Sequence, residues 1–436
     1  MALPQIGVVG SGMILEDQNG PALAQLVRRG VLGQVHIAAQ GSASLRRLLG
    51  LPWWRARFPD LPQGWVRTYP PLETDERVRR SDFYREMYRA LPPGSIVMIA
   101  VPDSAHETLI LEALEAGFHV VTVKSLCTRY DATRRIRDLA WEKGLFVGID
   151  FHKRWDTRAL IARAHWKDGY YGVPRAARAT MIEADSYIRS GSPFEKHFVP
   201  ETSDPATYVG CHYVDQFGWF TGLRPKQVVV NGVLGQFESG TPCYSWAATQ
   251  LTYDHCVLQI INGLQHAGDH RGRNHQGLEI WGYNPRDARG TYFCHLDHLR
   301  GMDYVFCRDR NPGRPTDAGS DYVGFIPRSD GRPGQEMVGY GWRAIEALVN
   351  AAIRVQDQSD LTARQKLLAE IDSANLIPTP ANTAYLGLVY QAMRESIQEH
   401  GMPVVIDYDR GVTRYRTAGG SDRAPGDLGS GAHRSG

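Results

Sequence analysis

The chain has 436 residues, 42% hydrophobic and 22% charged, and this composition predicts a globular protein of about two domains. Its 49 basic and 47 acidic side chains nearly balance, which disfavours nucleic acid and anionic membranes as partners because no basic excess is present. No signal-peptide pattern opens the sequence, and its apolar runs are far shorter than the roughly 20 residues of a membrane span. We therefore expect a cytoplasmic protein, whose six cysteines, lacking any C-x-x-C pair, are reduced and mostly buried.

The first 150 residues alternate short apolar runs with amphipathic segments, which is typical of βα units around a parallel sheet. A helix expected over 104–116 ends at Gly117, and Asp131 is the expected cap of a helix reaching residue 143. The stretch 53–71 is rich in tryptophan and proline and predicts an elaborated connection packed by aromatic side chains. Strands are predicted at residues 6–9, 35–39, 96–101, 119–123 and 145–149.

From about residue 172 the pattern changes to longer alternating runs, which predict an antiparallel sheet covered on one face. These runs span 226–233, 247–264 and 277–283. Later segments predict helices at 342–353 and 383–400 and a strand at 403–406. Residues 416–436 are rich in glycine, serine and arginine and predict a disordered tail.

Glycines directly after the first predicted strand form part of a dinucleotide-binding pattern. Gly10 fits the glycine that makes the tight turn, and Gly12 the one that lets the backbone approach a pyrophosphate at a helix N-terminus. Leu15 occupies the third glycine position, so the pattern is incomplete. No carboxylate follows the second strand to bind the ribose of NAD. Ser42 with Arg46 could instead hold the 2′-phosphate of NADP, or the arginine could belong to a solvated helix face.

A more specific pattern begins at residue 100. The segment Ala100-Val101-Pro102-Asp103-Ser104-Ala105-His106, followed by L-E-A-L-E-A-G-F-H-V-V-T-V-K-S, resembles the glucose–fructose oxidoreductase/inositol dehydrogenase (Gfo/Idh/MocA) family. That family usually has T-P-x-x-x-H, A-L-E-A-G-K-H-V and then E-K-P. The resemblance returns at residues 147–156 and at 210–222, where G-C-H-Y-V-D matches the family's G-x-H-x-x-D. It covers roughly residues 4–408.

The resemblance implies an NAD(P)-dependent oxidoreductase that acts on a hydroxyl carbon of a sugar, a sugar derivative or a cyclitol. With the patterns above it gives the fold class: an α/β Rossmann domain with a parallel sheet, at 1–152, and an α+β domain with a large, open, mostly antiparallel sheet, at 153–415. The late helices are expected to pack back toward the first domain, and the sheet to form a homodimer or homotetramer. The expected contacts to NAD or NADP are Gly10, Ser11, Gly12, Met13, Ile14, Gln40, Ser42, Arg46, Ala100, Val101, Pro102, His106 and Lys124.

Three residues match catalytic positions of the family. Lys124 would contact the reacting hydroxyl, where an ammonium stabilises a developing alkoxide; the alternative is an ordinary surface lysine. Val123 and Ser125 replace the family's glutamate and proline, which leaves open whether the lysine is used in the same way. His212 would be the general base, or a structural histidine. Tyr208 stands where many members have aspartate and would serve as a hydrogen-bond donor or acid.

Further polar residues are assigned to substrate or left open. Expected substrate contacts are His152, Lys153, Arg154 and Asp215, with an interdomain salt bridge as the alternative for Arg154. Two histidine clusters, at 266, 270 and 275 with Asp269 and at 295 and 298 with Asp297, match no zinc spacing, so we predict no metal site. A role in a substrate loop stays open for the first cluster. Two other functions also stay open: an NAD-dependent glycosidase that oxidises its sugar transiently, and a non-catalytic sensor of dinucleotide or sugar.

Overall fold

The computed structural model describes residues 3–189, 191–192, 194–195, 197–266, 274–296 and 322–416, and the backbone alone at 305–306, 316–317 and 422–423. These residues form two compact units. The first contains Met1–Cys127, Asp131–Leu160 and Ala318–Ala384, and the second contains Thr128–Tyr130, Ile161–Asp317 and Tyr385–Gly436. The chain thus leaves the first unit a few residues after the boundary expected at 152, and it returns there with two of the late helices.

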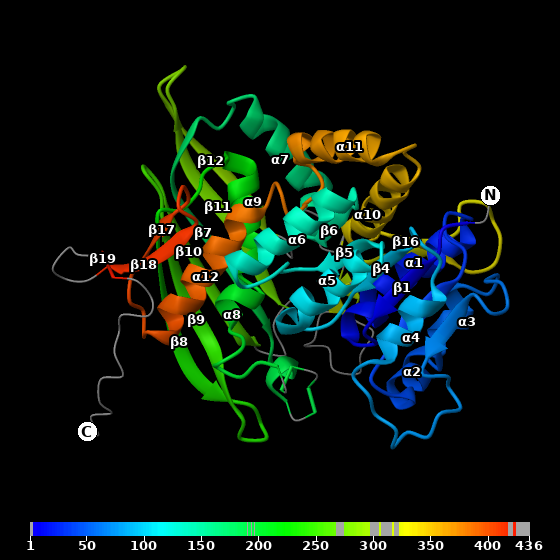
Figure 1. Ribbon diagram of the computed structural model, residues 1–436. Helices are drawn as coiled ribbons and strands as arrows, with labels where there is room; N and C mark the ends of the chain where they lie inside the picture. Colours follow the sequence, from blue (N-terminus) through cyan, green and yellow to red (C-terminus); the bar gives the residue numbers. More distant parts are fainter. Residues whose placement is uncertain are drawn as a thin grey trace. The chain divides into compact units, whose positions relative to one another are not determined.

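The first unit is built on six parallel strands in the order β3-β2-β1-β4-β5-β6. Figure 1 labels β1, β4, β5 and β6. Most of these short strands are buried along their whole length, as expected for a sheet covered on both faces. The order reverses direction between β1 and β4, and ligands bind open α/β sheets at the carboxyl ends of the strands beside such a reversal. The strands are β1 (Ile6–Val9), β2 (Val35–Ala38), β3 (Val66–Tyr69), β4 (Ile96–Ile99), β5 (His119–Val123) and β6 (Val147–Asp150).

Helices cover both faces of this sheet. Helices α1 and α10 share one core with the sheet, in which Leu23 and Leu348 are fully buried with Ile6. Helix α4 lies on the other face. A Cβ added to Gly7 of β1 would contact the side chains of Met87, which is in α4, and Leu91, which directly follows it. The helices of this unit are α1 (Gly20–Arg28), α2 (Ser42–Leu49), α3 (Trp53–Arg57), α4 (Phe83–Ala90), α5 (His106–Glu115), α6 (Tyr130–Lys143), α10 (Tyr340–Gln356) and α11 (Leu361–Ala374). Helix α7 (Thr157–Lys167) begins in the first unit and continues in the second.

Two local predictions in this unit need correction. Asp131 is the second residue of α6 and not its cap. The connection expected over 53–71 contains α3 and the edge strand β3, which its proline-rich, partly exposed sequence does not reveal. The predicted aromatic packing is present, since the Trp54 ring lies 4.1 Å from that of Trp53 and 5.5 Å from that of Trp65, measured between ring centroids.

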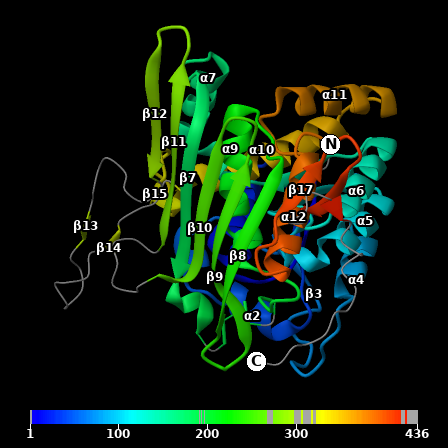
Figure 2. The ribbon, with the colours of Figure 1, turned by 90° about the vertical axis from the view of Figure 1, so that its left-hand side faces the viewer.

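The second unit is built on nine strands in the order β12-β11-β7-β10-β9-β8-β17-β18-β19, several of which lie side by side in Figure 2. All neighbours are antiparallel except β7 and β10, so the predicted open, mostly antiparallel sheet is confirmed. The strands are β7 (Val173–Ala184), β8 (Gln227–Gln236), β9 (Pro242–Thr252), β10 (Val257–His266), β11 (His275–Asn284), β12 (Arg289–Leu296), β17 (Val404–Asp407), β18 (Val412–Arg416) and β19 (Asp422–Arg423).

One face of this sheet is covered by helices α8 (Pro205–Tyr208), α9 (Cys211–Thr221) and α12 (Ala384–Gln398) (Figure 1). Along β7 the buried residues Ala177, Ala179 and Met181 alternate with more exposed ones, as a half-covered strand requires. The run predicted over 247–264 is two strands, β9 and β10, because its alternation continues through the turn that joins them. Two further pairs of residues, Val305–Phe306 and Thr316–Asp317, form a small separate ladder.

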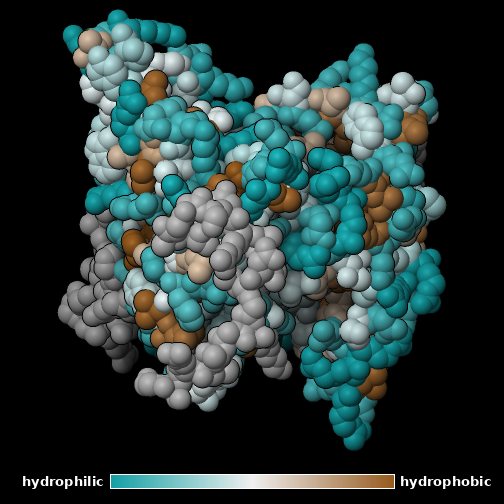
Figure 3. Space-filling model, turned by 60° about the vertical axis from the view of Figure 1, so that its left-hand side comes forward, coloured by the Kyte–Doolittle hydropathy of each residue, from teal (hydrophilic) through white to brown (hydrophobic). Residues whose placement is uncertain are grey.

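Several expectations concern the surface and the chain end. Within the ranges that the structure describes, no helix combines the length and the apolar character needed to cross a bilayer. On the face seen in Figure 3, hydrophobic residues form separate patches between hydrophilic ones, as is usual for globular proteins. The tail expected at 416–436 lies outside the described residues apart from Arg416 and the backbone of β19. The cytoplasmic location stays a prediction.

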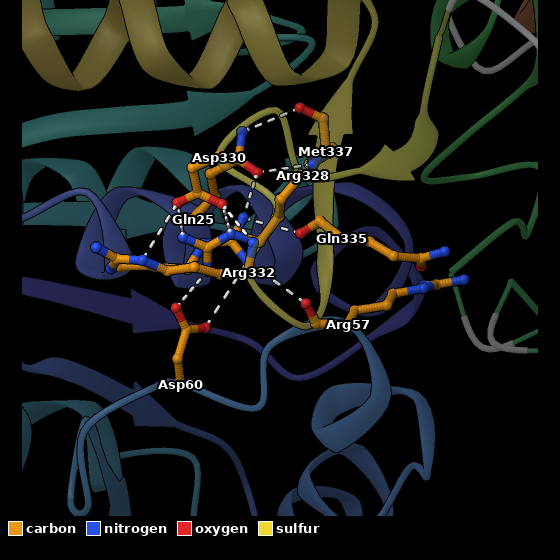
Figure 4. A network of polar contacts seen from close by, with 9 residues as sticks. Gln25, Arg57, Asp60, Arg328, Asp330, Arg332, Gln335 and Met337 are labelled. Atoms are coloured by element: carbon orange, nitrogen blue, oxygen red, sulfur yellow. Dashed lines mark hydrogen bonds and ion pairs between the residues drawn. The ribbon is translucent and has the colours of Figure 1, made fainter.

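A hairpin of the first unit is fastened to α1 by a polar network (Figure 4). Its strands are β15 (Gly324–Pro327) and β16 (Gln335–Val338). The Gln25 amide pairs with the Met337 backbone, donating to its carbonyl at 2.9 Å and accepting from its N–H at 2.7 Å. Arg328, nearly buried, forms ion pairs with Asp60 and Asp330. These contacts attach the hairpin to α1.

Candidate functional site

The two predicted glycines differ in the space around them. Gly10 follows β1 with φ of +116°, and a Cβ there would lie 2.2 Å from the Ala100 carbonyl oxygen. Only glycine fits where the ends of β1 and β4 approach this closely. Gly12 has nothing within 4 Å of its Cβ position, so its backbone is open to a ligand. A tight turn followed by an approachable backbone is the arrangement that a dinucleotide pyrophosphate requires, and these residues fit it.

The departure at Leu15 has a structural explanation. Residues Leu15–Asn19 form a turn of π-helix before α1 begins, and Leu15 is buried in the core. Gly20, the first residue of α1, takes the crowded position instead, because a Cβ there would meet the Leu15 carbonyl oxygen at 2.4 Å and the Trp54 ring at 3.0 Å. The glycine that permits close packing thus stands five residues later than the fingerprint places it, so the sequence pattern missed it.

Three other residues of the loop were predicted to contact the cofactor. The Ser11 hydroxyl donates to the Ser44 hydroxyl oxygen at 2.8 Å, which ties the loop to α2. Met13 is 37% exposed, and Ile14 packs against the core. Ser11 and Ile14 therefore help to hold the loop, and the cofactor contacts of all three residues stay predictions.

Ser42 and Arg46, which were expected to distinguish NADP from NAD, both contact the loop that follows β3. Ser42 is fully buried and its hydroxyl donates to the Thr74 carbonyl at 2.7 Å. Arg46 forms an ion pair with Glu76 at 2.7 Å. Both contacts fasten α2 to the loop that follows β3, and a phosphate contact by either residue stays a prediction.

A different arginine lies at the end of β2. Arg79 donates from Nη2 to the Gln40 side-chain oxygen at 3.3 Å. Its Cγ lies 3.6 Å from the Cβ position of Gly41. Arg79 could not be identified from sequence, because it stands 39 residues after Gln40 in an arginine-rich loop with no distinguishing spacing.

His106 joins the turns that follow β4 and β5. Its ring is fully buried, with Nε2 at 2.9 Å from the Val101 carbonyl oxygen and Nδ1 at 2.8 Å from that of Ser125. Val101 and Pro102 form the turn after β4, and Ser125 follows Lys124. Since both ring nitrogens face backbone carbonyls, His106 positions these two turns; its predicted contact to the cofactor stays a prediction.

Lys124 directly follows β5 at the carboxyl edge of the sheet and is half-buried. The register of the sheet places Val123, the residue before it, opposite Asp150 at the end of β6. The peptide bond between Lys124 and Ser125 is cis. Lys124 thus lies on the same edge as the glycine loop, where ligands of this sheet type bind.

A cluster of polar and aromatic side chains surrounds His152 in the first unit. Gln18 is fully buried and donates to Asp150 Oδ2 at 2.8 Å, while its own oxygen accepts from the Tyr322 hydroxyl. The His152 Nδ1 atom lies 3.8 Å from the same Asp150 oxygen. The His152 ring contacts those of Tyr322 and Tyr340 at centroid distances of 4.8 and 5.7 Å. His152 is therefore held at the carboxyl edge of β6 by residues that no local pattern could identify.

The two basic residues after His152 are buried in the first unit. Lys153 is 3% exposed and Arg154 1% exposed. Arg154 donates to the Asn375 side-chain oxygen at 3.3 Å, and Asn375 is the left-handed residue that ends α11. This bond fastens the 3-10 turn His152–Trp155 to α11 within one unit. The predicted substrate contacts of both residues stay predictions.

In the second unit a buried ion pair fixes the start of α8, the helix that ends at Tyr208. Asp204 is fully buried and caps α8 by accepting from the Thr207 N–H at 2.8 Å. Arg394 of α12 donates to Asp204 at 2.6 Å and to the Glu201 carbonyl at 2.9 Å. Asp204 and Arg394 were missed because they are 190 residues apart.

The predicted proton-transfer residues lie on α8 and α9. Tyr208 packs edge-on against the rings of Phe194 and Phe198 at 5.8 and 4.8 Å between centroids. His212 and Asp215 are 3% and 1% exposed, and their spacing places them on one side of α9. These three residues belong to the second unit and Lys124 to the first.

Residues 5–151 match the model of an oxidoreductase family with an NAD-binding Rossmann fold. The match begins at β1 and ends directly after β6, so it contains the whole six-stranded sheet. The N-terminal part of the chain therefore matches the glucose–fructose oxidoreductase/inositol dehydrogenase family that the sequence resembles.

Curated relatives align with parts of the chain. The inositol 2-dehydrogenase of Rubrobacter xylanophilus is 28% identical over 138 residues, which are 31% of this chain and 37% of that protein. The levoglucosan dehydrogenase of Pseudarthrobacter phenanthrenivorans is 23% identical over 234 residues, which are 52% of this chain and 57% of that protein. Across six curated relatives, the aligned stretches span 32–57% of the relative's length.

A solved structure extends the likeness to both units. An inositol dehydrogenase homologue from Azotobacter vinelandii, complexed with NADH and myo-inositol, superposes with a TM-score of 0.59 over 93% of this chain and 98% of its own. The two sequences are 17% identical, so the likeness establishes a shared fold.

The structure describes the two histidine clusters only in part. Within the described ranges, no group of three or more His, Cys, Asp or Glu side chains is arranged to hold a metal ion. The rings of His266 and His275 lie 6.2 Å apart between centroids, and His295 is buried at the end of β12. Residues 269, 270, 297 and 298 lie outside the described residues.

Proposed function

We propose that this protein transfers hydride between a hydroxyl-bearing carbon of a sugar, sugar derivative or cyclitol and the nicotinamide of NAD or NADP. The observation that carries the proposal is the common location of the glycine loop and Lys124 at the carboxyl edge of the family's Rossmann sheet. The relatives support the substrate class, since they include an inositol 2-dehydrogenase and a levoglucosan dehydrogenase.

The glycine loop would hold the dinucleotide. Gly10 makes the turn that clears the end of β4, and the open backbone at Gly12 would approach the pyrophosphate. Arg79, beside Gln40 at the end of β2, would face the adenosine ribose or its phosphate. When bound, the nicotinamide ring accepts or supplies the hydride.

The protein's own groups would manage charge and protons at the reacting oxygen. The Lys124 ammonium would donate a hydrogen bond to this oxygen and stabilise negative charge on it. His212 would take the hydroxyl proton during oxidation and return it during reduction, with Tyr208 as a second hydrogen-bond donor. His152, fixed by Asp150 and two tyrosine rings, would hold a neighbouring hydroxyl.

The test is to purify the protein, identify any retained dinucleotide, and follow reduced nicotinamide spectroscopically across a panel of sugars and cyclitols. We expect reduction of NAD or NADP by at least one polyol and loss of this activity in Lys124→Ala. Failure of all polyols to reduce either cofactor would contradict the proposal. Release of an aglycone from aryl glycosides without net reduction would replace it with a redox-assisted glycosidase, and dinucleotide binding without turnover would replace it with a sensor.

We further propose that the open face of the second unit's sheet joins copies of this chain into a homodimer or homotetramer. Four large hydrophobic side chains on this sheet are 39–53% exposed: Ile261, Trp281, Tyr283 and Tyr292. Light scattering on the purified protein tests the proposal. We expect a mass of two or four chains that falls in a Trp281→Arg variant; a monomer at all concentrations would contradict it.

A further inference from the structure

The covered face of the second unit's sheet changes from apolar to polar toward one end. Its central positions include Ala179, Ile260 and Ile280, all buried. At the end where β7 and β10 finish, buried polar residues replace them on four neighbouring strands, which Figure 2 shows side by side. This polar row consists of Asn262 on β10, Glu183 on β7, Gln276 on β11 and His295 on β12, with exposures of 0%, 6%, 8% and 6%.

The register of the sheet gathers these residues into one patch. Met181 pairs with Asn262 on one side and with Gln276 on the other, so these three residues lie side by side across three strands. Glu183 stands two residues after Met181 and therefore on the same face. His295 pairs with Leu278, two residues from Gln276. Directly opposite residues on such strands have Cβ atoms about 5 Å apart and diagonal neighbours about 7–8 Å, so the row is contiguous.

The polar row adjoins the helices that carry the proposed proton-transfer residues. A Cβ added to Gly210 would lie 2.6 Å from Asn262 Oδ1, so the backbone entering α9 lies directly against the row. His212 is two residues further on. Tyr208 packs against the cluster that contains Leu264, which follows Asn262 by two residues on the same face of β10. The row and the proposed acid–base residues therefore form one continuous region of the second unit.

The side chains of the row suit hydroxyl groups. The Glu183 carboxylate is fixed by the Asn274 amide, which donates to its Oε2 at 2.9 Å. The Asn262 amide donates to the Met181 carbonyl at 3.3 Å, so this residue helps to hold the strands of the row in register. A carboxylate accepts, whereas amides and an imidazole both donate and accept, as polyol hydroxyls require. The row contains no lysine or arginine to bind an anionic substrate.

We propose that Glu183, Gln276 and His295 bind hydroxyl groups of a neutral polyhydroxylated ring and thereby select the substrate. The proposal rests on the proposed function and names the substrate class of the same site. Glu183 accepts from one hydroxyl, and Gln276 and His295 hold others, while the ring carbon to be oxidised is presented to His212 and Tyr208.

The first experiment compares two glutamates on neighbouring strands that face opposite sides of the sheet. Glu183→Gln removes the buried carboxylate, and Glu279→Gln is the matched control, since Glu279 lies on the open face and accepts from Tyr292 at 2.6 Å. The readouts are KM, kcat, and the Kd of a neutral cyclitol in the presence of reduced cofactor. We expect Glu183→Gln to raise KM and Kd at least about tenfold, the loss of a charge-assisted hydrogen bond, while the Kd for the dinucleotide and the control remain unchanged.

The second experiment removes hydroxyls from the substrate. We expect the penalty of Glu183→Gln to disappear for the one deoxy analogue that lacks the hydroxyl bound by Glu183. Gln276→Ala should show the same behaviour for a different hydroxyl, and it keeps the test open if Glu183→Gln does not fold.

The outcomes separate the two proposals. Unchanged KM and Kd for the polyol in folded Glu183→Gln and Gln276→Ala would refute substrate binding by the polar row. The proposed oxidoreductase function would not be affected by that result. Wild-type protein that binds the dinucleotide but neither binds nor oxidises a polyol would instead overturn the proposed function. Tighter wild-type binding of an amino analogue than of the neutral ring would overturn the choice of a neutral substrate.

Discussion

The two sheets of this molecule present their proposed functional side chains in different ways. In the first unit they lie where the chain leaves a strand, as Gly10 leaves β1 and Lys124 leaves β5, so the direction of the backbone places them. In the second unit the proposed ones lie on the covered face of long strands, as Glu183 and Gln276 do, so the register between strands places them. A site of the first kind leaves a pattern in consecutive residues, whereas a site of the second kind does not.

The largest effect should come from the edge of the first sheet. Lys124→Ala removes the cation expected to stabilise the reacting oxygen, and such a loss costs about 10²–10³ in kcat. Lys143→Ala is the control, because Lys143, at the end of α6, forms an ion pair with Glu115 at 2.8 Å. Steady-state kinetics with the best polyol provide the measurement. A kcat within threefold of wild type would show that Lys124, between Val123 and Ser125, does not take part in catalysis.

Substitutions at Gly10 and Gly12 should differ in their effects on stability, although both should weaken dinucleotide binding. Gly10→Ala forces a methyl group against the Ala100 carbonyl and imposes an unfavourable φ, which we expect to destabilise the first unit by about 1–3 kcal/mol as well as to abolish dinucleotide binding. Gly12→Ala has room for its methyl group and should fold normally, yet bind dinucleotide at least about tenfold more weakly because the methyl group occupies the approach to the backbone.

Urea unfolding and fluorescence titration with reduced cofactor test this contrast. Equal losses of stability in the two variants would show that the open space at Gly12 is not there in solution. Normal binding by folded Gly12→Ala would remove the glycine loop from the dinucleotide site.

The same contrast explains how much could be predicted from sequence. The strands Ile6–Val9 and His119–Val123 were predicted at their observed bounds, because short apolar runs beside glycines have few alternatives. The location of Gly10 and Lys124 at one sheet edge follows from their positions after such strands. The bond between Gln18 and Tyr322 joins residues 304 apart, and the ring contacts of His152 also depend on a distant hairpin, so no local spacing contains them.

Two buried histidines should make the first unit the acid-sensitive one. Burial lowers the pKa of His119 to about 4, and burial with nearby Arg67 lowers the pKa of His36 to about 4. His119 Nδ1 accepts from the Phe146 N–H at 2.9 Å, a bond that protonation of this nitrogen would break. The folded pKa of each histidine lies below the unfolded value of 6.5. Its contribution to the free energy of unfolding is therefore fully present above pH 6.5 and is lost as the pH falls from 6.5 toward 4. Each histidine contributes roughly 3 kcal/mol over that window.

Hydrogen exchange measured separately for peptides of each unit at pH 7.5 and 4.5 checks this prediction. We expect protection to fall in the first unit and to hold in the second, where burial raises the pKa of Glu395, so that protonation of that carboxyl favours the folded state as the pH falls. His119→Gln should reduce the pH dependence of the first unit. Equal loss of protection in both units would contradict the assignment to the two histidines.

The smallest effect should be on the affinity for NADP(H) relative to NAD(H), through Arg79 beside the end of β2. Arg79 is the cation beside Gln40, whereas Arg46 is engaged by Glu76, so Arg79→Ala should weaken NADP(H) by about tenfold, the value of one charge-assisted hydrogen bond, and leave NAD(H) unchanged. Arg77→Ala is the matched control, since Arg77 pairs with Asp75 within the same loop at 2.6 Å. Fluorescence titration with both reduced cofactors gives the four dissociation constants needed. A selective loss in the control instead would move the phosphate contact along the loop. No loss in either variant would return it to Ser42 and Arg46, one of the two alternatives that the sequence left open.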